Sequence, residues 1–124
     1  MYHCHIHFYF VGQESGVFSH VKRSAPWEHF TYTFTESREP SAALAADSDV
    51  IFAALQGTDA PERLRLLLDS KRPEAECILL TDAETLPLLT DHLPEVADIW
   101  RLPLSQEETA FRFSRWQARC KREK

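Results

Sequence analysis

Cysteine, methionine and glycine are scarce in this chain, whose 124 residues include three cysteines, one methionine and three glycines. Cys4, Cys77 and Cys120 are an odd number at no metal-like spacing, so we expect free thiols in a reducing compartment, with the cytoplasm as the default. No apolar run approaches the roughly 20 residues that a membrane span needs, and the first residues lack the pattern of a signal peptide. We therefore expect neither a disulfide scaffold nor a membrane or exported protein.

Basic residues are scarce over most of the length. Residues 1–111 carry 8 basic and 18 acidic side chains, a net charge of −10, whereas residues 112–124 carry six basic side chains and one acidic one, a net charge of +5. Affinity for nucleic acid depends on Lys and Arg side chains that neutralise phosphates, so the acidic body argues against a nucleic-acid partner. A basic amphipathic end can bind a membrane surface or nucleic acid, but we interpret it as a solvated helix that leads into a following domain.

Short apolar runs alternate with helical patterns along the whole chain. The expected strands are residues 6–11, 30–35, 50–55, 77–80 and 99–102. The expected helices are residues 13–23, 40–46, 61–70 behind an N-cap at Thr58 or Asp59, 84–92, and a last helix that opens at Ser105 and continues to the chain end. This alternation predicts one α/β domain, in which a parallel sheet lies between two layers of helices.

For five strands in a chain of this length, the order 2-1-3-4-5 of a flavodoxin-like (βα)5 sandwich is the expected topology. In such a sheet, ligands bind outside the carboxyl ends of the strands. We therefore expect any functional site of this chain at the ends of strands 1, 3, 4 and 5.

Two stretches of the sequence resemble the receiver domains of two-component response regulators. SREPSAALAADSDVIFAAL is similar to the second helix and third strand of that family, and ADIWRLPLSQEET to its fifth strand, proline turn and final helix. The order and spacing of elements match over essentially the whole chain. The resemblance implies a receiver-like domain in residues 1–108, and in residues 109–124 the end of a helix that continues as a linker to an output domain.

The resemblance also identifies a degenerate phosphoacceptor pocket. In receivers an acidic pair after strand 1 holds Mg²⁺, an Asp at the end of strand 3 accepts the phosphoryl group, a Ser or Thr ends strand 4, and a Lys precedes a Pro after strand 5. The corresponding residues here are Gly12 and Gln13, Ala54, Thr81, and Leu102 before Pro103. A methyl group cannot accept a phosphoryl group, and Mg²⁺ needs clustered oxygen ligands. We expect no catalytic residue, metal or cofactor in this pocket.

Three neighbouring carboxylates do not change that expectation. Glu14 is the only acidic residue close to the position of the acidic pair. Asp59 and Asp82 follow strands 3 and 4, where carboxylates commonly cap helices by accepting backbone N–H bonds. We interpret both aspartates as loop or cap residues.

The loop GQESG at residues 12–16 follows strand 1, where phosphate-binding loops lie, but it is neither G-x-G-x-x-G nor a Walker A sequence. In flavodoxins the equivalent loop is rich in Ser and Thr, whereas here it offers only Ser15. Ser15, Ser19 and His20 lack the surroundings of a nucleophile elbow. We therefore expect no enzyme activity, although a small-molecule pocket at the strand ends stays open as an alternative.

Trp100, Phe113 and Trp116 are the candidate interaction face. Receivers commonly dimerise through helix 4, strand 5 and helix 5, so the resemblance implies that aromatic side chains there can anchor a homodimer. Packing at the edge of a small domain explains these residues equally well. Trp27, next to Pro26, is expected to have a packing role.

Together these features predict a phosphorylation-independent pseudo-receiver. Its partners would be another protein or its own output module, such as a sensory, histidine-kinase or diguanylate cyclase domain. One alternative is a flavodoxin-like small-molecule-binding domain or enzyme with a pocket at the strand ends. A second is a stand-alone adaptor that docks a kinase or another receiver.

His3, His5 and His7 alternate along the first strand, which places three imidazoles on one face, a geometry that can bind Zn²⁺. Chain starts often fray, however, and no second cluster of ligands completes a shell. Calorimetric titration with Zn²⁺ is expected to show no site tighter than micromolar. A stoichiometric nanomolar site would overturn this interpretation.

Overall fold

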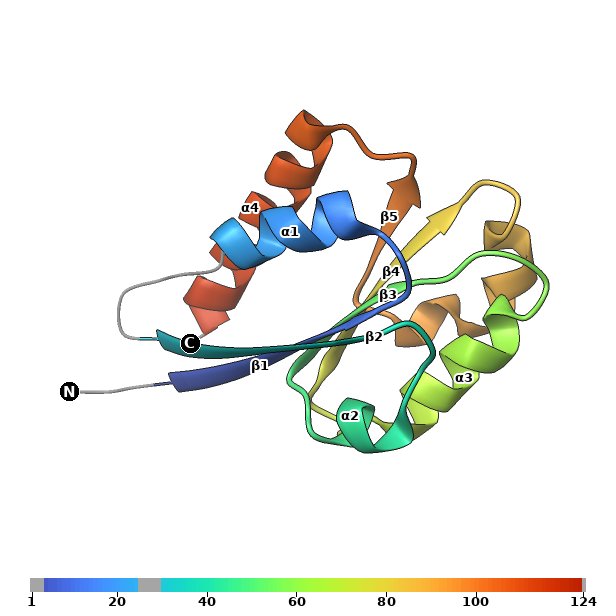
Figure 1. The fold of residues 1–124 in the computed structure, drawn as a ribbon, viewed down its shortest axis with the longest axis horizontal. Helices are drawn as coiled ribbons and strands as arrows, with labels where there is room; N and C mark the ends of the chain where they lie inside the picture. The colour runs from blue at the N-terminus through green and yellow to red at the C-terminus, as the bar shows by residue number, and fades with distance from the viewer. Residues whose placement is uncertain (1–3, 25–29, 124) are drawn as a thin grey trace.

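The computed structural model describes residues 4–24 and 30–123 and confirms the predicted α/β architecture (Figure 1). Five parallel strands form one sheet in the order β2-β1-β3-β4-β5. The strands are β1 (Cys4–Val11), β2 (Phe30–Ser37), β3 (Val50–Ala54), β4 (Glu76–Asp82) and β5 (Asp98–Leu102). The helices are α1 (Ser15–Ser24), α2 (Ala42–Ala46), α3 (Ala60–Ser70), the 3-10 helix η1 (Leu86–Glu95) and α4 (Gln106–Glu123).

Helices cover both faces of the sheet, as Figure 1 shows: α1 and α4 lie on one side, and α2, α3 and η1 lie on the other. The chain crosses between β2, at one edge, and β3 by passing over β1, so the direction of the strand order reverses between β1 and β3. This reversal places a crevice between the carboxyl ends of β1 and β3.

The core beneath α1 and α4 is aromatic, and Phe52 on β3 lies at its centre. Its ring centroid is 6.1 Å from that of Phe8, 5.5 Å from that of Phe10, 5.4 Å from that of Trp100 and 6.5 Å from that of Trp116. Offset and edge-on arrangements at these distances are favourable beyond the area that they bury. The aromatic layer therefore joins β1, β3 and β5 to the last helix.

The core on the opposite face is aliphatic. Leu64 and Leu67 of α3 pack with Ile51 and Leu79 of the central strands and with Leu89 of η1. The three- and four-residue spacing of apolar residues in α3 produces this single buried stripe. Apolar residues on both faces of β3 and β4 explain why these strands read as continuous apolar runs.

The predicted helix at residues 84–92 is corrected by the structure, which has the 3-10 helix η1 at Leu86–Glu95. Pro94, near its end, lacks the backbone N–H that an α-helix would use, whereas Pro87 lies in the first turn, where that N–H has no helical partner. Bonds of the i to i+3 type form instead, from the N–H of Leu88 to the carbonyl of Thr85 at 2.9 Å.

The helix starts agree closely with the predictions. Asp59 is the N-cap residue of α3, one of the two predicted positions, but its side chain makes no capping bond. It lies instead 2.9 Å from the guanidinium of Arg63. Ser105 precedes α4, and its hydroxyl accepts a hydrogen bond from the backbone N–H of Glu108 at 3.1 Å. Within residues 4–24 and 30–123, no helix is both long and apolar enough to cross a bilayer.

Replacement of Phe52 by Ala is expected to lower the free energy of unfolding by about 3–5 kcal/mol, because it leaves a cavity in the middle of the aromatic layer. Phe111→Ala is the matched control, since the Phe111 ring is 61% exposed, and its expected effect is within about 0.5 kcal/mol. Urea denaturation followed by circular dichroism measures both. Equal effects of the two substitutions would contradict the assigned core.

Candidate functional site at the carboxyl ends of the strands

A cavity of about 350 Å³ lies at the carboxyl ends of β1 and β3, at the place where the strand order reverses. It brings together Gly12, Gln13 and Ala54, three of the residues assigned to the degenerate pocket. The other lining residues are Glu14, Arg38, Glu39, Gln56 and Arg63. The predicted position of the site is thus where the structure has a cavity.

Gly12 lies very close to the backbone at the end of β3. Its φ angle is +101°, and a Cβ atom added to it would lie 2.4 Å from the carbonyl oxygen of Ala54 and 3.1 Å from the Ala54 Cβ. The Gly12 N–H donates to the Ser37 carbonyl at 3.0 Å, which ties the residue to β2. Only glycine fits this backbone without displacement of the end of β3. An acidic side chain therefore cannot occupy this position in the observed conformation.

The Thr81 hydroxyl is engaged inside the protein. Thr81 is fully buried, and its Oγ1 donates to the carbonyl of Leu55 at 2.7 Å. It does not line the cavity beside Gly12 and Ala54. Although its position matches the switch hydroxyl of receivers, in this structure it bridges the ends of β3 and β4.

Leu102 and Pro103 do not line that cavity either. The Leu102 side chain packs in the aromatic core cluster, and the peptide bond to Pro103, itself exposed, is cis. Leu102 stands where receivers have a lysine, and its apolar side chain in the core supplies no positive charge to the strand ends. The structure thus brings Gly12, Gln13 and Ala54 together but leaves Thr81, Leu102 and Pro103 outside their cavity.

Two arginines, Arg38 and Arg63, line the rim of this cavity. Arg63 lies 3.0 Å from a carboxylate oxygen of Glu39 and 2.9 Å from one of Asp59. With its amide oxygen turned toward Arg38, Gln13 accepts hydrogen bonds from that guanidinium at 3.0 and 3.1 Å. These pairings were not predicted, because Arg38 follows β2 and Arg63 lies in α3, both remote in sequence from the ends of β1 and β3.

The carboxylates near the cavity do not form a metal site. Partial burial raises the pKa of Glu14, and Glu39 and Asp59 are paired with Arg63. Among the described residues, no group of three or more His, Cys, Asp or Glu side chains is placed to hold a metal ion. The residues present do not fit the Mg²⁺ of an active receiver.

Asp82 has the cap-like role predicted for it. Its Oδ1 accepts a hydrogen bond from the backbone N–H of Thr85 at 2.8 Å. Hydrogen bonds from the side chain and then the backbone of Thr85 hold the pKa of this carboxyl below its usual range. The carboxylate thus stabilises the turn before η1.

Trp100, Phe113 and Trp116, the candidate interaction face, are buried within this domain. Their exposed fractions are 0%, 1% and 2%. The Trp100 indole N–H donates to Asp98 Oδ2 at 3.0 Å, and that of Trp116 donates to Glu76 Oε1 at 3.1 Å. The alternative interpretation, that these side chains pack the edge of the domain, is the one that the structure shows.

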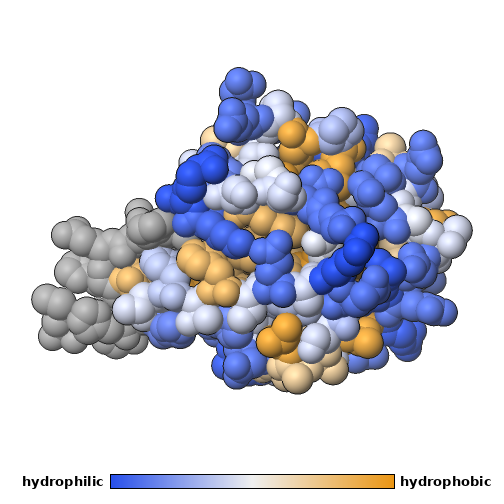
Figure 2. All heavy atoms as spheres, viewed as in Figure 1, coloured by the Kyte–Doolittle hydropathy of each residue, from blue (hydrophilic) through white to orange (hydrophobic). Residues whose placement is uncertain are grey.

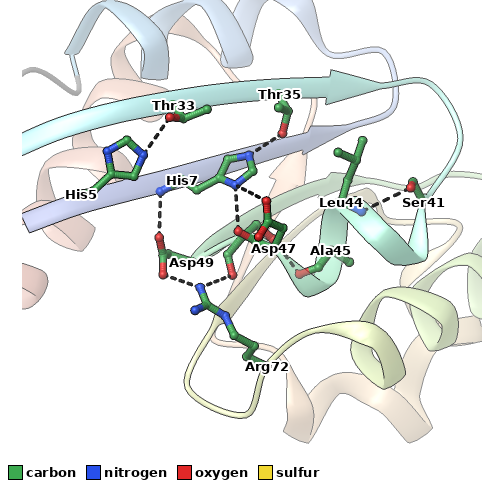
Figure 3. Close-up of polar contacts among 11 residues, drawn as sticks. His5, His7, Thr33, Thr35, Ser41, Leu44, Ala45, Asp47, Asp49 and Arg72 are labelled. Carbon is green, nitrogen blue, oxygen red and sulfur yellow. Dashed lines mark hydrogen bonds and ion pairs between the residues drawn. The ribbon is translucent and has the colours of Figure 1, made fainter.

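His5 and His7 lie on the same face of β1, as the alternation predicts, but their ring nitrogens already have partners (Figure 3). Both ring nitrogens of His5 lie 2.8 Å from threonine hydroxyls of β2. In His7, Nε2 lies 2.8 Å from the Thr35 hydroxyl, and Nδ1 lies 2.8 Å from the Asp47 carbonyl. His3, the third member of the candidate cluster, lies outside the described residues.

The polar contacts of His7 continue into a brace between β1, β3 and the loop before β4 (Figure 3). The His7 backbone N–H donates to Asp49 Oδ2 at 2.8 Å. The other carboxylate oxygen of Asp49 lies 2.6 Å from the guanidinium of Arg72. These bonds satisfy polar groups at the amino ends of the strands, far from the cavity.

Cys77 is a free, buried thiol. Desolvation raises its pKa to about 12, so the thiol stays protonated at neutral pH. The side chains of Cys4 and Cys120, and the whole of Trp27, lie outside the described residues. The prediction of free thiols is confirmed at Cys77.

Comparisons with solved structures show a receiver-like, flavodoxin-like fold. A CpaE2 pilus assembly protein from Sinorhizobium meliloti matches with a TM-score of 0.57 at 15% identity, over 85% of this chain and 95% of that one. An adenylate cyclase structure from Rhodopirellula baltica has a TM-score of 0.57 at 12% identity, over 89% and 85%. A pilus assembly-related protein from Burkholderia pseudomallei has a TM-score of 0.54 at 22% identity, over 89% and 87%. No family model and no curated protein matches the sequence.

Gly12→Ala is expected to lower the free energy of unfolding by about 1–3 kcal/mol, because the added methyl group combines a positive φ with a backbone clash. Gly16→Ala is the matched control. Nothing lies within 4 Å of a Cβ at Gly16, and this exposed position in α1 is expected to gain up to about 1 kcal/mol. Opposite signs in urea denaturation support the close approach, and a neutral Gly12→Ala would refute it.

Proposed function

We propose that this chain is a receiver-like signalling module that acts through protein contacts and independently of phosphorylation. The observation that carries the proposal is the contact between Gly12 and Ala54. A methyl group stands at the acceptor position, and the facing backbone leaves no room for a Cβ, and hence for a carboxylate. The two features together remove the nucleophile and one metal ligand of the receiver reaction.

The residues at the other positions of the receiver reaction have structural roles. The Thr81 hydroxyl donates to a backbone carbonyl, and Leu102, at the position of the lysine, packs in the core. Arg63 forms ion pairs with both Glu39 and Asp59. These two carboxylates are therefore already paired with a cationic side chain. These observations favour a binding role and no catalytic activity.

The last helix is the element best placed to transmit a change in the domain. Phe113 and Trp116 fix α4 to the aromatic core, and Arg119 lies 3.2 Å from a carboxylate oxygen of Glu76 at the start of β4. The Gln117 side chain donates to the carbonyl of Ser24 at the end of α1 at 3.0 Å. Helix α4 thus contacts both β4 and α1. A shift of either element would move α4 and so reach an attached output module or a docked partner in the cytoplasm.

A small-molecule-binding domain is the second candidate. It is favoured by the 350 Å³ cavity, which lies at the strand-order reversal where ligands of this architecture bind. Arg38 and Arg63 on its rim would suit an anionic ligand. Native mass spectrometry of the purified protein separates the two candidates: a stoichiometric co-purified small molecule favours the binding domain.

Incubation with Mg²⁺ and acetyl phosphate, or with Mg²⁺ and beryllofluoride, is expected to give no adduct. Intact-mass spectrometry detects a phosphoryl group, and fluorine NMR detects bound beryllofluoride. Ala54→Asp is expected to stay unmodified too, because an added nucleophile does not restore the metal ligands. A receiver domain with an intact acidic site is the positive control. A stable adduct at any carboxylate of the unmodified chain would overturn the proposal.

A further inference from the structure

A basic groove runs along the outer side of α4 and has a cavity of about 410 Å³. Phe111 lies in it with 61% of its surface exposed, and the Arg115 guanidinium carbon is 5.8 Å from the centroid of its ring. Arg112 and Arg119 extend the same lining, and Asp98 of β5 lies at the groove. We refer to this surface as the α4 groove.

The α4 groove contains more positive than negative side chains. Arg119 pairs with Glu76 at 3.2 Å, and the Asp98 carboxylate accepts hydrogen bonds from the Trp100 indole and the Ile99 N–H. Among the described residues, Arg112 and Arg115 form no ion pair with a carboxylate. Aromatic side chains and arginines are the residues that are enriched at protein interfaces.

A second groove, between α3 and η1, has the opposite charge and a cavity of about 330 Å³. Its lining includes Asp69, Asp91 and Glu95. Arg65 pairs weakly with Asp69 at 3.8 Å, and His92 lies 3.9 Å from Glu95. Asp91 has no ion-pair partner in the part of the chain that the structure describes. We refer to this surface as the α3–η1 groove.

Exposed apolar side chains lie on the helices that form the two grooves. On the face seen in Figure 2, hydrophobic side chains are dispersed among hydrophilic ones. Three large hydrophobic side chains of the described residues are exposed: Phe111 in the α4 groove, Leu66 on α3 at 39% and Leu88 on η1 at 50%. Leu66 and Leu88 do not line the α3–η1 groove itself, but each precedes by three residues an aspartate that does, so each neighbours that aspartate on the surface of its helix.

We propose that the α4 groove of one copy docks on the α3–η1 groove of a second copy. Arg112 and Arg115 would face Asp69, Asp91 and Glu95, and Phe111 would pack against Leu66 and Leu88. Opposite charge on the two surfaces favours this arrangement, whereas contact between two α4 grooves would oppose like charges. The inference rests on the proposed function, since it names a second copy as the protein partner.

The arrangement of the fold makes this contact head-to-tail. Figure 1 shows α4 on one side of the sheet and α3 and η1 on the other, so the two grooves of one copy face different neighbours. A contact between unlike surfaces repeats until a ring closes or a filament forms. The assembly is therefore expected to grow beyond a dimer as the protein concentration rises.

Light scattering coupled to size exclusion tests the proposal with two charge reversals. Arg112→Glu with Arg115→Glu, and separately Asp91→Lys with Glu95→Lys, are each expected to weaken self-association roughly ten-fold or more. All four substitutions in one chain restore complementary charge and are expected to restore association. Added salt should weaken the contact in the unmodified chain, because exposed charges are screened.

Matched controls carry the same charge change elsewhere. Arg23→Glu with Arg101→Glu, and Glu74→Lys with Glu84→Lys, alter exposed residues outside both grooves and outside the strand-end cavity and are expected to leave the mass unchanged. Circular dichroism checks that every variant is folded. A monomer at all concentrations, or a fourfold variant that stays monomeric, would overturn the proposal. Neither result affects the phosphorylation experiment, so the two proposals fail independently.

Discussion

The stacking of aromatic side chains around Phe52 sets the orientation of the last helix and hence the surface that the domain displays. Phe113 and Trp116 of α4 enter this layer and are nearly inaccessible to solvent. Because a helix that buries one stripe exposes the opposite one, Phe111 and Arg115 face outward. The packing that stabilises the fold therefore also selects the side chains that a partner can reach.

A second constraint acts at the carboxyl ends of the strands. Gly12 lies so close to Ala54 that no side chain fits at position 12. The hydroxyl of Thr81 and the side chain of Leu102 are used for hydrogen bonding and packing. The fold is receiver-like, and the residues at these positions take part in hydrogen bonding and packing.

The signalling module that we propose would respond only through differences in binding between its states. Charge is distributed to suit such a role: surplus arginines lie along α4, and surplus carboxylates lie between α3 and η1. Electrostatic complementarity of this type gives specificity and fast association more than raw affinity. The contact would then depend on local concentration and ionic strength, as expected for a reversible assembly.

The amino-acid sequence by itself determined the order of strands and helices, the parallel three-layer fold and the presence of an alanine at the end of the third strand, because periodicity and residue type are local properties. It did not decide whether Trp100 and Trp116 are buried, and it did not show that Arg63 lines the cavity. Those features were decided by tertiary structure. Which side of a helix is buried, and which distant side chains meet, depends on how each element packs against segments remote in the chain.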